Sequence, residues 1–147
     1  MSEELCFASA TELADRIRKI ALSPVELMKA YLDRIEAVNP SLNAVVTLDE
    51  RAMDRAREAE AALMTGEPLA PLHGVPFTAK DSVDVEGVRT TRGSRLFEDF
   101  VPSADAVAVT RLKDAGAIFM GHTNVPEFVF WFETDNKVFG RTENPWK

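Results

Sequence analysis

The 147-residue sequence predicts an α/β fold, in which N-terminal helices pack on the first strands of a mostly parallel sheet. Two observations support this prediction. Up to residue 66 apolar residues recur at helical spacing, whereas from residue 67 the pattern becomes strand, loop, helix and strand. Strands joined by such a crossover pair in parallel. No shift in composition separates two domains, so residues 1–66 are a helical lead-in and residues 67–147 begin an α/β core.

Two helices are predicted before residue 40. Ser9 opens a capping-box pattern, so the first helix begins after it. The face that this helix buries carries Leu13, Ile17 and Ile20. The second helix has a stronger start, because Ser23 can cap it, Pro24 suits its first position and Glu26 can reach back to the cap. Asn39-Pro40 is expected to end it. Its apolar stripe consists of Leu27, Tyr31, Ile35 and Val38.

The remaining elements follow in order. Asp49 is predicted to cap an alanine-rich helix that closes near Gly66. Its inward residues are Ala52, Ala56, Ala59 and Leu63. The others are a strand over Asn43–Leu48, a loop over Glu67–Gly74, a strand over Val75–Lys80, a loop over Glu86–Arg95, a helix over Asp105–Ala115 and a strand over Ala117–Met120. Ser103 is expected to cap the last helix and Gly116 to stop it.

Composition disfavours several classes of function. The net charge of −7, without a basic cluster, disfavours binding to nucleic acid. No stretch approaches the ~18 apolar residues of a membrane-spanning helix, and the acidic start, Met1–Glu4, differs from a secretory signal. The single cysteine, Cys6, cannot form an internal disulfide. We therefore expect a cytoplasmic protein with no membrane span and no nucleic-acid partner.

Lys80 ends the predicted strand that precedes the crossover. In parallel sheets, functional residues gather at the carboxyl ends of the strands. A lysine that is withdrawn from water loses its proton more readily and can then act as a base. The alternative is a solvated lysine paired with Asp81, and the spacing alone favours this alternative because most lysines lie at the surface.

No residues are predicted to hold a metal or an organic cofactor. His73 and His122 each stand alone, without the spacing of a metal site, and are interpreted as loop residues. Cys6 lies in the N-terminal tail without an evident activating partner, which argues against a nucleophilic role. The scattered glycines form neither a dinucleotide-binding nor a phosphate-binding motif, and are interpreted as turns and helix ends.

Residues 128–132, Phe-Val-Phe-Trp-Phe, form a dense apolar run. The first interpretation is a core segment or a lid that packs on the sheet. The second is a wall for an apolar group of a substrate, because binding pockets are lined mainly by apolar side chains. Both interpretations can hold for different residues of the run.

Several segments, in the same order, resemble the amidase signature family. They are residues 71–81, 90–94, 104–109 with 112–118, 121–128 and 139–146. The match is tight over about residues 70–147, whereas residues 9–66 resemble only the helical lead-in of these enzymes. Five segments in register make the resemblance specific. It implies that the chain is the N-terminal part of a single amidase signature domain, with a mostly parallel mixed sheet.

The resemblance implies that Lys80 is the catalytic lysine of a serine–serine–lysine triad. In this family the buried, neutral lysine deprotonates a bridging serine, which activates a nucleophilic serine to form an acyl-enzyme, without a cofactor. The family's serines belong to a segment rich in glycine and serine, which this chain lacks. We therefore predict that the chain is inactive by itself and is not labelled by a fluorophosphonate probe.

Two branches of the family compete. Val129, Phe130 and Phe132 align with positions that line the acyl pocket in hydrolases of the fatty-acid amide hydrolase type. The alternative is the glutaminase (A) subunit of the tRNA-dependent amidotransferase, which usually carries small and hydroxyl residues at this place. The aromatic run favours a stand-alone hydrolase with a small-molecule amide substrate.

A third alternative is a non-catalytic remnant that binds a partner or nothing. The nucleotide sequence downstream of codon 147 discriminates, because an in-frame segment rich in serine and glycine indicates an enzyme. A chain without the family's later strands would expose apolar faces and unpaired strand edges. We therefore expect self-association, as a homo-oligomer or an aggregate.

Overall fold

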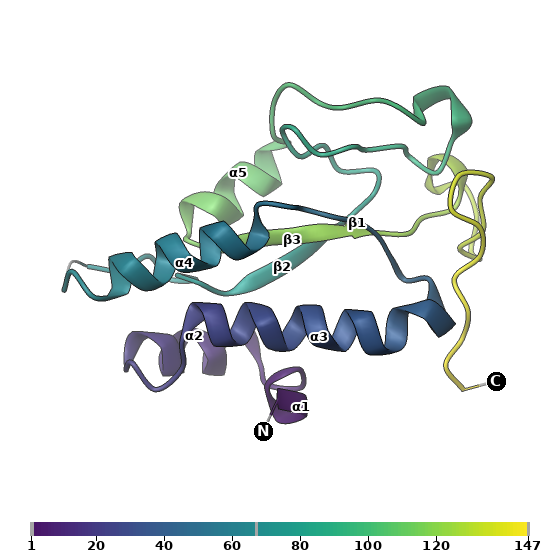
Figure 1. Cartoon of the computed structure of the whole chain (residues 1–147). Coiled ribbons are helices and arrows are strands. Elements are labelled where there is room, and N and C mark those ends of the chain that lie inside the picture. Colours follow the sequence, from purple (N-terminus) through teal and green to yellow (C-terminus); the bar gives the residue numbers. More distant parts are fainter. Residues whose placement is uncertain (1, 67, 147) are drawn as a thin grey trace.

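A computed structural model describes residues 2–66 and 68–146, so Met1, Glu67 and Lys147 lie outside the described residues. It confirms the predicted α/β class (Figure 1). The helices are α1 (Ser2–Leu5), α2 (Ala10–Arg18), α3 (Pro24–Leu42), α4 (Ala52–Leu63) and α5 (Val107–Asp114). The strands are β1 (Val45–Leu48), β2 (Pro76–Lys80) and β3 (Ile118–Thr123), with short 3₁₀ turns η1 (Arg95–Phe97) and η2 (Glu127–Val129). Within this part of the chain, no helix has both the length and the apolar content that crossing a membrane requires.

β3 is the central strand of a mixed sheet, which has the order β1-β3-β2 in the described chain. β2 and β3 run parallel, as the crossover through α5 predicts. β1 runs antiparallel to β3. β3 continues three residues beyond the predicted end at Met120, and Gly121 permits this: a Cβ there would lie 2.6 Å from the carbonyl oxygen of Thr47 on β1. The extension brings the ends of β3 and β2 level.

Helices cover both faces of the sheet (Figure 1). On one face α3 and α4 pack on β3 through Met28, Ala52, Ala56, Ile118 and Met120. On the other face α5 and the loop after β2 pack on β3 through Val85, Val88, Val109 and Phe119. Phe119 and Met120 are neighbours in sequence but point to opposite faces, because side chains alternate along a strand. Because of this alternation, Met120 packs against α3 and α4, whereas Phe119 packs against α5 and the loop after β2.

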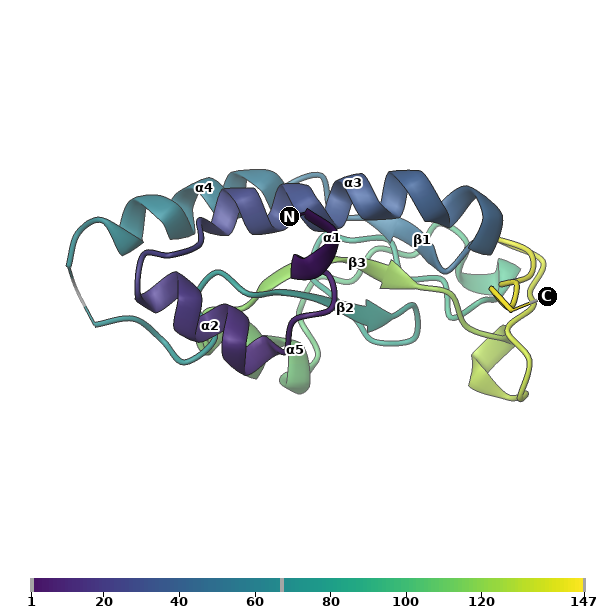
Figure 2. The ribbon, with the colours of Figure 1, turned by 90° about the horizontal axis from the view of Figure 1, so that it is seen from below.

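α2 lies beside the first turns of α3 (Figure 2). Ser9 and Ser23 cap the two helices, as predicted. The predicted inward residues Leu13 and Ile17 are buried between them, but the placement of Ile20 on this face is wrong. α2 ends at Arg18, and Ile20 adopts a φ of 56° in the reversal that follows, which leaves its side chain 65% exposed.

α3 continues past Asn39-Pro40 to Leu42, so the predicted end of this helix is also wrong. A proline near the end of a helix removes one backbone hydrogen bond without stopping the last turn. The Asn39 side chain points forward and accepts hydrogen bonds from the backbone amides of Ala44 and Val45, both at 2.8 Å. Asn43 ends the helix in a left-handed conformation with a φ of 54°. The start of β1 is thereby held against the end of α3.

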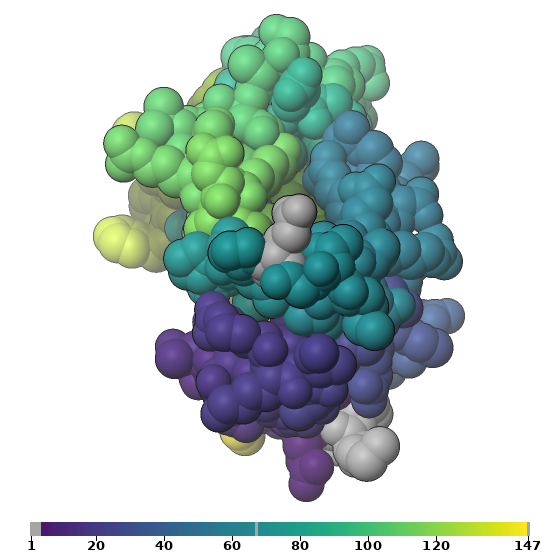
Figure 3. Space-filling model, turned by 90° about the vertical axis from the view of Figure 1, so that its left-hand side faces the viewer, coloured from purple at the N-terminus to yellow at the C-terminus, as the bar shows by residue number. Residues whose placement is uncertain are grey.

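The turn over residues 68–74 fills the space between α2 and α5 (Figure 3). The Leu72 amide donates to the carbonyl of Ala115 at 2.7 Å. Gly74 has a φ of +75°, and a Cβ there would lie 2.8 Å from the Pro24 ring, so this position requires glycine. The helical lead-in and the core are thus in direct contact before β2 begins.

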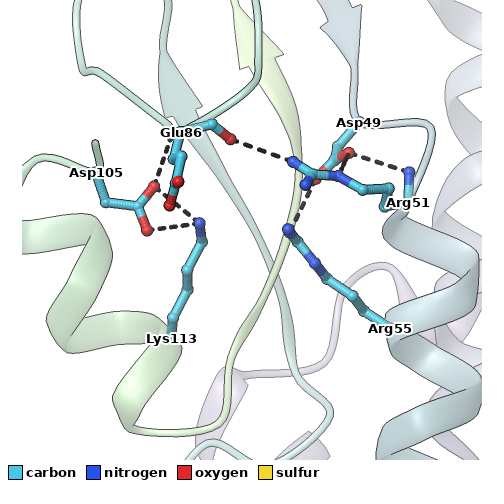
Figure 4. A network of polar contacts seen from close by, with 6 residues as sticks. All are labelled: Asp49, Arg51, Arg55, Glu86, Asp105 and Lys113. Carbon is cyan, nitrogen blue, oxygen red and sulfur yellow. Dashed lines mark hydrogen bonds and ion pairs between the residues drawn. The ribbon is translucent and has the colours of Figure 1, made fainter. Parts of the chain in front are cut away.

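Asp49 is buried and binds the start of α4, although the helix itself begins three residues later. Its Oδ1 accepts from the Arg51 amide at 3.0 Å, and its Oδ2 accepts from Arg55 Nη1 at 2.9 Å. Arg51 Nη2 donates in turn to the carbonyl of Glu86 at 3.2 Å (Figure 4). The Asp49 carboxylate therefore holds the start of α4, and Arg51 continues the connection to the loop after β2.

Asp105 precedes α5 and does not begin it, since the helix starts at Val107 without a side-chain cap from Ser103 or any other residue. Burial favours a raised pKa for Asp105, but hydrogen bonds from Lys113 Nζ and the Glu86 amide hold the pKa below its usual range. These bonds are 2.7–2.8 Å long (Figure 4). The predicted start and cap of this helix are wrong because Asp105 binds the loop after β2 instead.

Candidate active site

Lys80 is the last residue of β2 and lies opposite Thr123 at the end of β3. Its side chain is exposed, so the described residues do not provide the burial of this lysine that the resemblance implies. Lys80 ends β2, an edge strand that pairs only with β3 among the described residues. Lys80 therefore stands at the carboxyl edge of the parallel pair, open to groups from outside the described residues.

The alternative interpretation of Lys80 is right about its exposure but wrong about its partner, because Asp81 does not pair with it. Asp81 is fully buried, and its carboxylate faces the threonine–glycine loop (residues 90–94). The Thr91 amide donates to Oδ1 at 3.0 Å, the Thr91 hydroxyl donates to Oδ2, and the Gly93 amide donates to Oδ2 at 3.4 Å. Successive residues at a strand end point to opposite sides. The lysine thus faces solvent while the carboxylate faces the interior.

The threonine–glycine loop is held between Asp81 and the residues that follow β3. The Arg92 amide donates to the carbonyl of Asp81 at 2.8 Å, and the Arg92 carbonyl accepts from the Phe128 amide at 2.8 Å. Gly93 has a φ of +66°, and a Cβ there would lie 2.9 Å from the carbonyl oxygen of Val125. The close approach requires glycine at this point of the loop.

His122 is a fully buried residue of β3, so its interpretation as a loop residue is wrong. His73 lies in the turn before β2, as predicted. His122 Nδ1 lies 3.4 Å from the carbonyl oxygen of Ala79, and Nε2 lies 3.2 Å from the Thr90 hydroxyl. The Thr90 hydroxyl donates its single proton to the carbonyl of Val88 at 3.0 Å, so it is available to His122 Nε2 as an acceptor. The ring packs against Phe119 at a centroid distance of 5.0 Å.

Acid is expected to destabilise the protein through His122. Burial lowers the pKa of His122 below 6.5, although the charges of Asp81 and Asp84 oppose the shift. The unfolded chain therefore takes up a proton before the folded one. The stabilisation is complete above about pH 6.5 and is lost as the pH falls through the folded-state pKa, at up to about 1.4 kcal/mol per pH unit. Urea unfolding of the complete protein between about pH 7.5 and 5.5 measures the loss.

The same titration of His122→Gln isolates this contribution, and His73→Gln is the matched control. We expect the free energy of unfolding to fall less steeply with acid in His122→Gln than in the wild type or the control. Equal slopes for all three proteins would contradict the assignment.

Asn124, directly after β3, binds the segment 134–143 to the carboxyl edge of the sheet. Its Nδ2 donates to the carbonyl of Gly140 at 3.1 Å and to Thr142 Oγ1 at 3.0 Å. Its Oδ1 accepts from Asn136 Nδ2 at 2.7 Å and from the following backbone amide at 3.0 Å. Both donors and both lone pairs of this amide are therefore engaged.

The other side of the segment binds the end of α3. Thr142 Oγ1 donates to the carbonyl of Asn43 at 2.7 Å, and Asn43 Nδ2 donates to the carbonyl of Phe139 at 2.8 Å. The Glu143 amide donates to the carbonyl of Leu42 at 2.8 Å. The chain thus leaves residue 143 beside the end of α3, on the side of the sheet where β2 and β3 end (Figure 1).

The aromatic segment (residues 128–132) is exposed, so its interpretation as a core segment or packed lid is wrong. The exposed fractions of Val129, Phe130 and Phe132 are 42%, 86% and 99%. Phe128 and Val129 have φ values of 53° and 59°. This left-handed conformation is strained for any side chain and most of all for a β-branched one. Strain of this kind concentrates at functional sites.

The carboxyl edge therefore combines an accessible primary amine, an exposed aromatic segment and buried polar groups that tie the connecting loops together. Sequence reasoning missed the buried groups, namely Asp81, Thr91, Asn124 and Asn136. A signal for them exists: polar residues flanking the apolar strands must find hydrogen-bond partners if they are buried. Among residues 2–66 and 68–146, no three His, Cys, Asp or Glu side chains are arranged to hold a metal ion.

Comparison with known proteins identifies relatives along nearly the whole chain. The family model described as "Amidase" matches residues 26–147. An acylamidase of Rhodococcus erythropolis is 44% identical over 99% of this chain and 31% of its own length. The A subunit of the glutamyl-tRNA(Gln) amidotransferase of Carboxydothermus hydrogenoformans is 43% identical over 97% of this chain and 30% of its own length.

The solved structure of a fatty acid amide hydrolase is similar to this one, with a TM-score of 0.92 and 26% identity. The match covers 99% of this chain and 26% of that one. The chain therefore spans about 30% of the length of the curated relatives it matches.

Proposed function

The chain belongs to the amidase signature family, and on that premise we propose that Lys80 is the catalytic base of an enzyme that hydrolyses a carboxylic amide. The observation that carries this proposal is the position of Lys80 at the carboxyl end of β2, beside β3. Ligand sites of open α/β sheets lie at such ends. The exposed amine is accessible to hydroxyl groups supplied from outside the chain.

In the proposed mechanism, a segment outside this chain covers Lys80, whose amine then takes the proton of a bridging serine, which takes the proton of the nucleophilic serine. The nucleophilic oxygen attacks the amide carbonyl, the carbon–nitrogen bond breaks, and the amine leaves with the relayed proton. Water then cleaves the acyl-enzyme and releases the carboxylic acid. Backbone amides stabilise the oxyanion. None of the seven serines of this chain lies in a segment rich in glycine and serine, so we propose that both catalytic serines lie outside it.

A fluorophosphonate probe and a panel of amides test the proposal. The complete protein is expected to react with the probe at one serine and to release acid and amine from a subset of the amides. Residues 1–147 alone are expected to remain unlabelled. Stoichiometric labelling of residues 1–147 would show that the nucleophile is misassigned. A complete protein that cleaves no amide would refute the hydrolase function.

We propose that Val129, Phe130 and Phe132 line the binding site of an apolar acyl group. Their exposure leaves them available to a ligand, and the strain at Phe128 and Val129 supports a functional role for the segment. The similarity to a fatty acid amide hydrolase agrees with this substrate class. Replacing all three by serine is expected to lower kcat/KM for long-chain or aryl amides while leaving acetamide hydrolysis nearly unchanged. Equal losses for both substrates would contradict the assignment.

The second candidate is the glutaminase subunit of a tRNA-dependent amidotransferase, favoured by the 43% identity to a protein of that kind. The aromatic segment argues for the stand-alone hydrolase, because a glutamine side chain offers little apolar surface to an aromatic wall. Glutamine hydrolysis that exceeds acyl-amide hydrolysis would reverse this order.

Two further properties are proposals. A cytoplasmic location agrees with the single cysteine, which forms no internal disulfide, and cell fractionation tests it. Self-association of residues 1–147 agrees with the open outer edge of β2, and a monodisperse monomer in analytical ultracentrifugation would contradict it.

A further inference from the structure

We infer that Asp81 is a positioning residue that holds the backbone of Lys80 and the aromatic segment in one arrangement; the inference rests on the proposed function of Lys80. Asp81 follows Lys80 directly and is 0% exposed. A carboxylate is rarely buried without strong partners. Here the partners are hydrogen-bond donors of the threonine–glycine loop, so the buried side chain of Asp81 holds that loop in place.

The backbone of Asp81 anchors the end of β2. Its amide donates to the carbonyl of Thr123 at 2.9 Å, which extends the pairing of β2 and β3 one residue beyond Lys80. Its carbonyl accepts from the Arg92 amide at 2.8 Å. The peptide units on the carboxyl side of Lys80 are thereby fixed on both edges, and the direction in which the Lys80 side chain leaves the backbone is fixed with them.

The side chain of Asp81 orders the loop that lies against the chain after β3. Three donors converge on it, two from Thr91 and one from Gly93. The Gly93 amide also lies 3.1 Å from Thr91 Oγ1, which closes a small buried network. The opposite side of Gly93 contacts the carbonyl of Val125. The loop therefore lies between the Asp81 carboxylate and the residues that directly precede the aromatic segment.

The same loop carries the bonds that hold the aromatic segment. The Arg92 carbonyl accepts from the Phe128 amide at 2.8 Å, and the Ser94 hydroxyl donates to Glu127 Oε1 at 2.7 Å. Phe128 is the first strained residue of the segment. Its left-handed backbone persists only while the surroundings enforce it. Asp81 thus connects the proposed base to the proposed acyl-binding residues through the threonine–glycine loop.

Asp81→Asn tests the inference with little change in volume. The carboxamide has only one acceptor oxygen. Its NH₂ group would face a backbone N–H, of Thr91 or Gly93, that donates to the carboxylate in the wild type. The loop is expected to loosen at Gly93, and Lys80 is expected to lose its alignment. A misplacement of about 1 Å lowers turnover by about 10²-fold. Thr91→Val removes one bond to Asp81 and is expected to cost about tenfold, whereas Thr91→Ser keeps the hydroxyl and is expected to recover most of the loss.

The experiment uses the complete protein and counts active sites by fluorophosphonate labelling, so that kcat is expressed per labelled site. Hydrogen exchange, read by mass spectrometry, follows peptides that cover residues 90–94 and 125–130. We expect Asp81→Asn to lower kcat per labelled site and to accelerate exchange in both peptides together. Asp99→Asn, an exposed aspartate on the same connection, is the matched control and is expected to behave as the wild type.

Each outcome decides the inference. A variant that loses labelled sites but keeps wild-type turnover per site would show that Asp81 serves stability alone. Faster exchange in residues 90–94 without a change in 125–130 would break the link to the aromatic segment. If Asp81→Asn does not fold, the Thr91→Val and Thr91→Ser pair gives the answer. If the wild type cleaves no amide, the proposed function fails, while the exchange data still test the link.

Discussion

Replacing Lys80 by methionine is expected to lower amide hydrolysis by the complete protein by about 10⁴-fold or more. Methionine keeps the length and the apolar stem of lysine but has no nitrogen to accept a proton. Without the base, neither serine hydroxyl becomes a strong nucleophile, so acylation slows and binding does not. The loss should therefore appear in kcat, with KM changing little. Single-turnover release of the amine measures it directly.

The rate of fluorophosphonate labelling should fall in parallel, because the probe needs the same activated serine. Lys29→Met is the matched control, since Lys29 is exposed on α3 and forms a surface ion pair with Asp33. Such pairs contribute only a few tenths of a kcal/mol, so the control should keep wild-type turnover. Full hydrolysis by Lys80→Met would remove the basis of the proposed mechanism.

Replacing Asn124 by alanine is expected to lower the free energy of unfolding by about 3 kcal/mol. The change removes four hydrogen bonds at once. It leaves the Val125 amide, in a residue only 1% exposed, and the Gly140 carbonyl without these partners. Each buried polar group without a partner costs about 1–3 kcal/mol. Urea unfolding of the complete protein measures the loss.

Asn144→Ala is the matched control, because within the described part of the chain its carboxamide accepts only from the exposed Trp146 amide. Its cost should stay below about 0.5 kcal/mol. Asn124→Ala should also increase proteolysis within residues 134–143, because this segment loses its attachment to the end of β3. Equal stability of the two variants would contradict the anchoring role of Asn124.

Most of the fold was predictable because local rules decide it. The caps at Ser9 and Ser23 and the crossover between two apolar strands all appear in the structure. The errors lie at element ends, where a distant partner overrides the local signal. α3 passes Pro40 because Asn39 binds the start of β1, and α5 starts late because Asp105 binds the loop after β2. Boundaries of this kind depend on contacts that periodicity does not contain.

The candidate site was predictable only in part. The strand-end position of Lys80 is confirmed, while its catalytic role and the binding role of Val129, Phe130 and Phe132 stay predictions. The interpretation of His122 failed because the strand runs further than its apolar residues do. The exposure of the aromatic segment could not be predicted, because composition alone does not distinguish a core from a binding surface.

The fold class, the family and the place of Lys80 at the end of β2 were all predictable from the amino-acid sequence. These follow from short-range periodicity and from motifs that occur in a fixed order. Long-range contacts alone show that Asp81 turns inward to the threonine–glycine loop, that His122 is buried, and that the aromatic segment is exposed. Each of these features depends on which residues, ten or more positions apart, supply the hydrogen-bond partners and the packing surface that a polar or aromatic group needs.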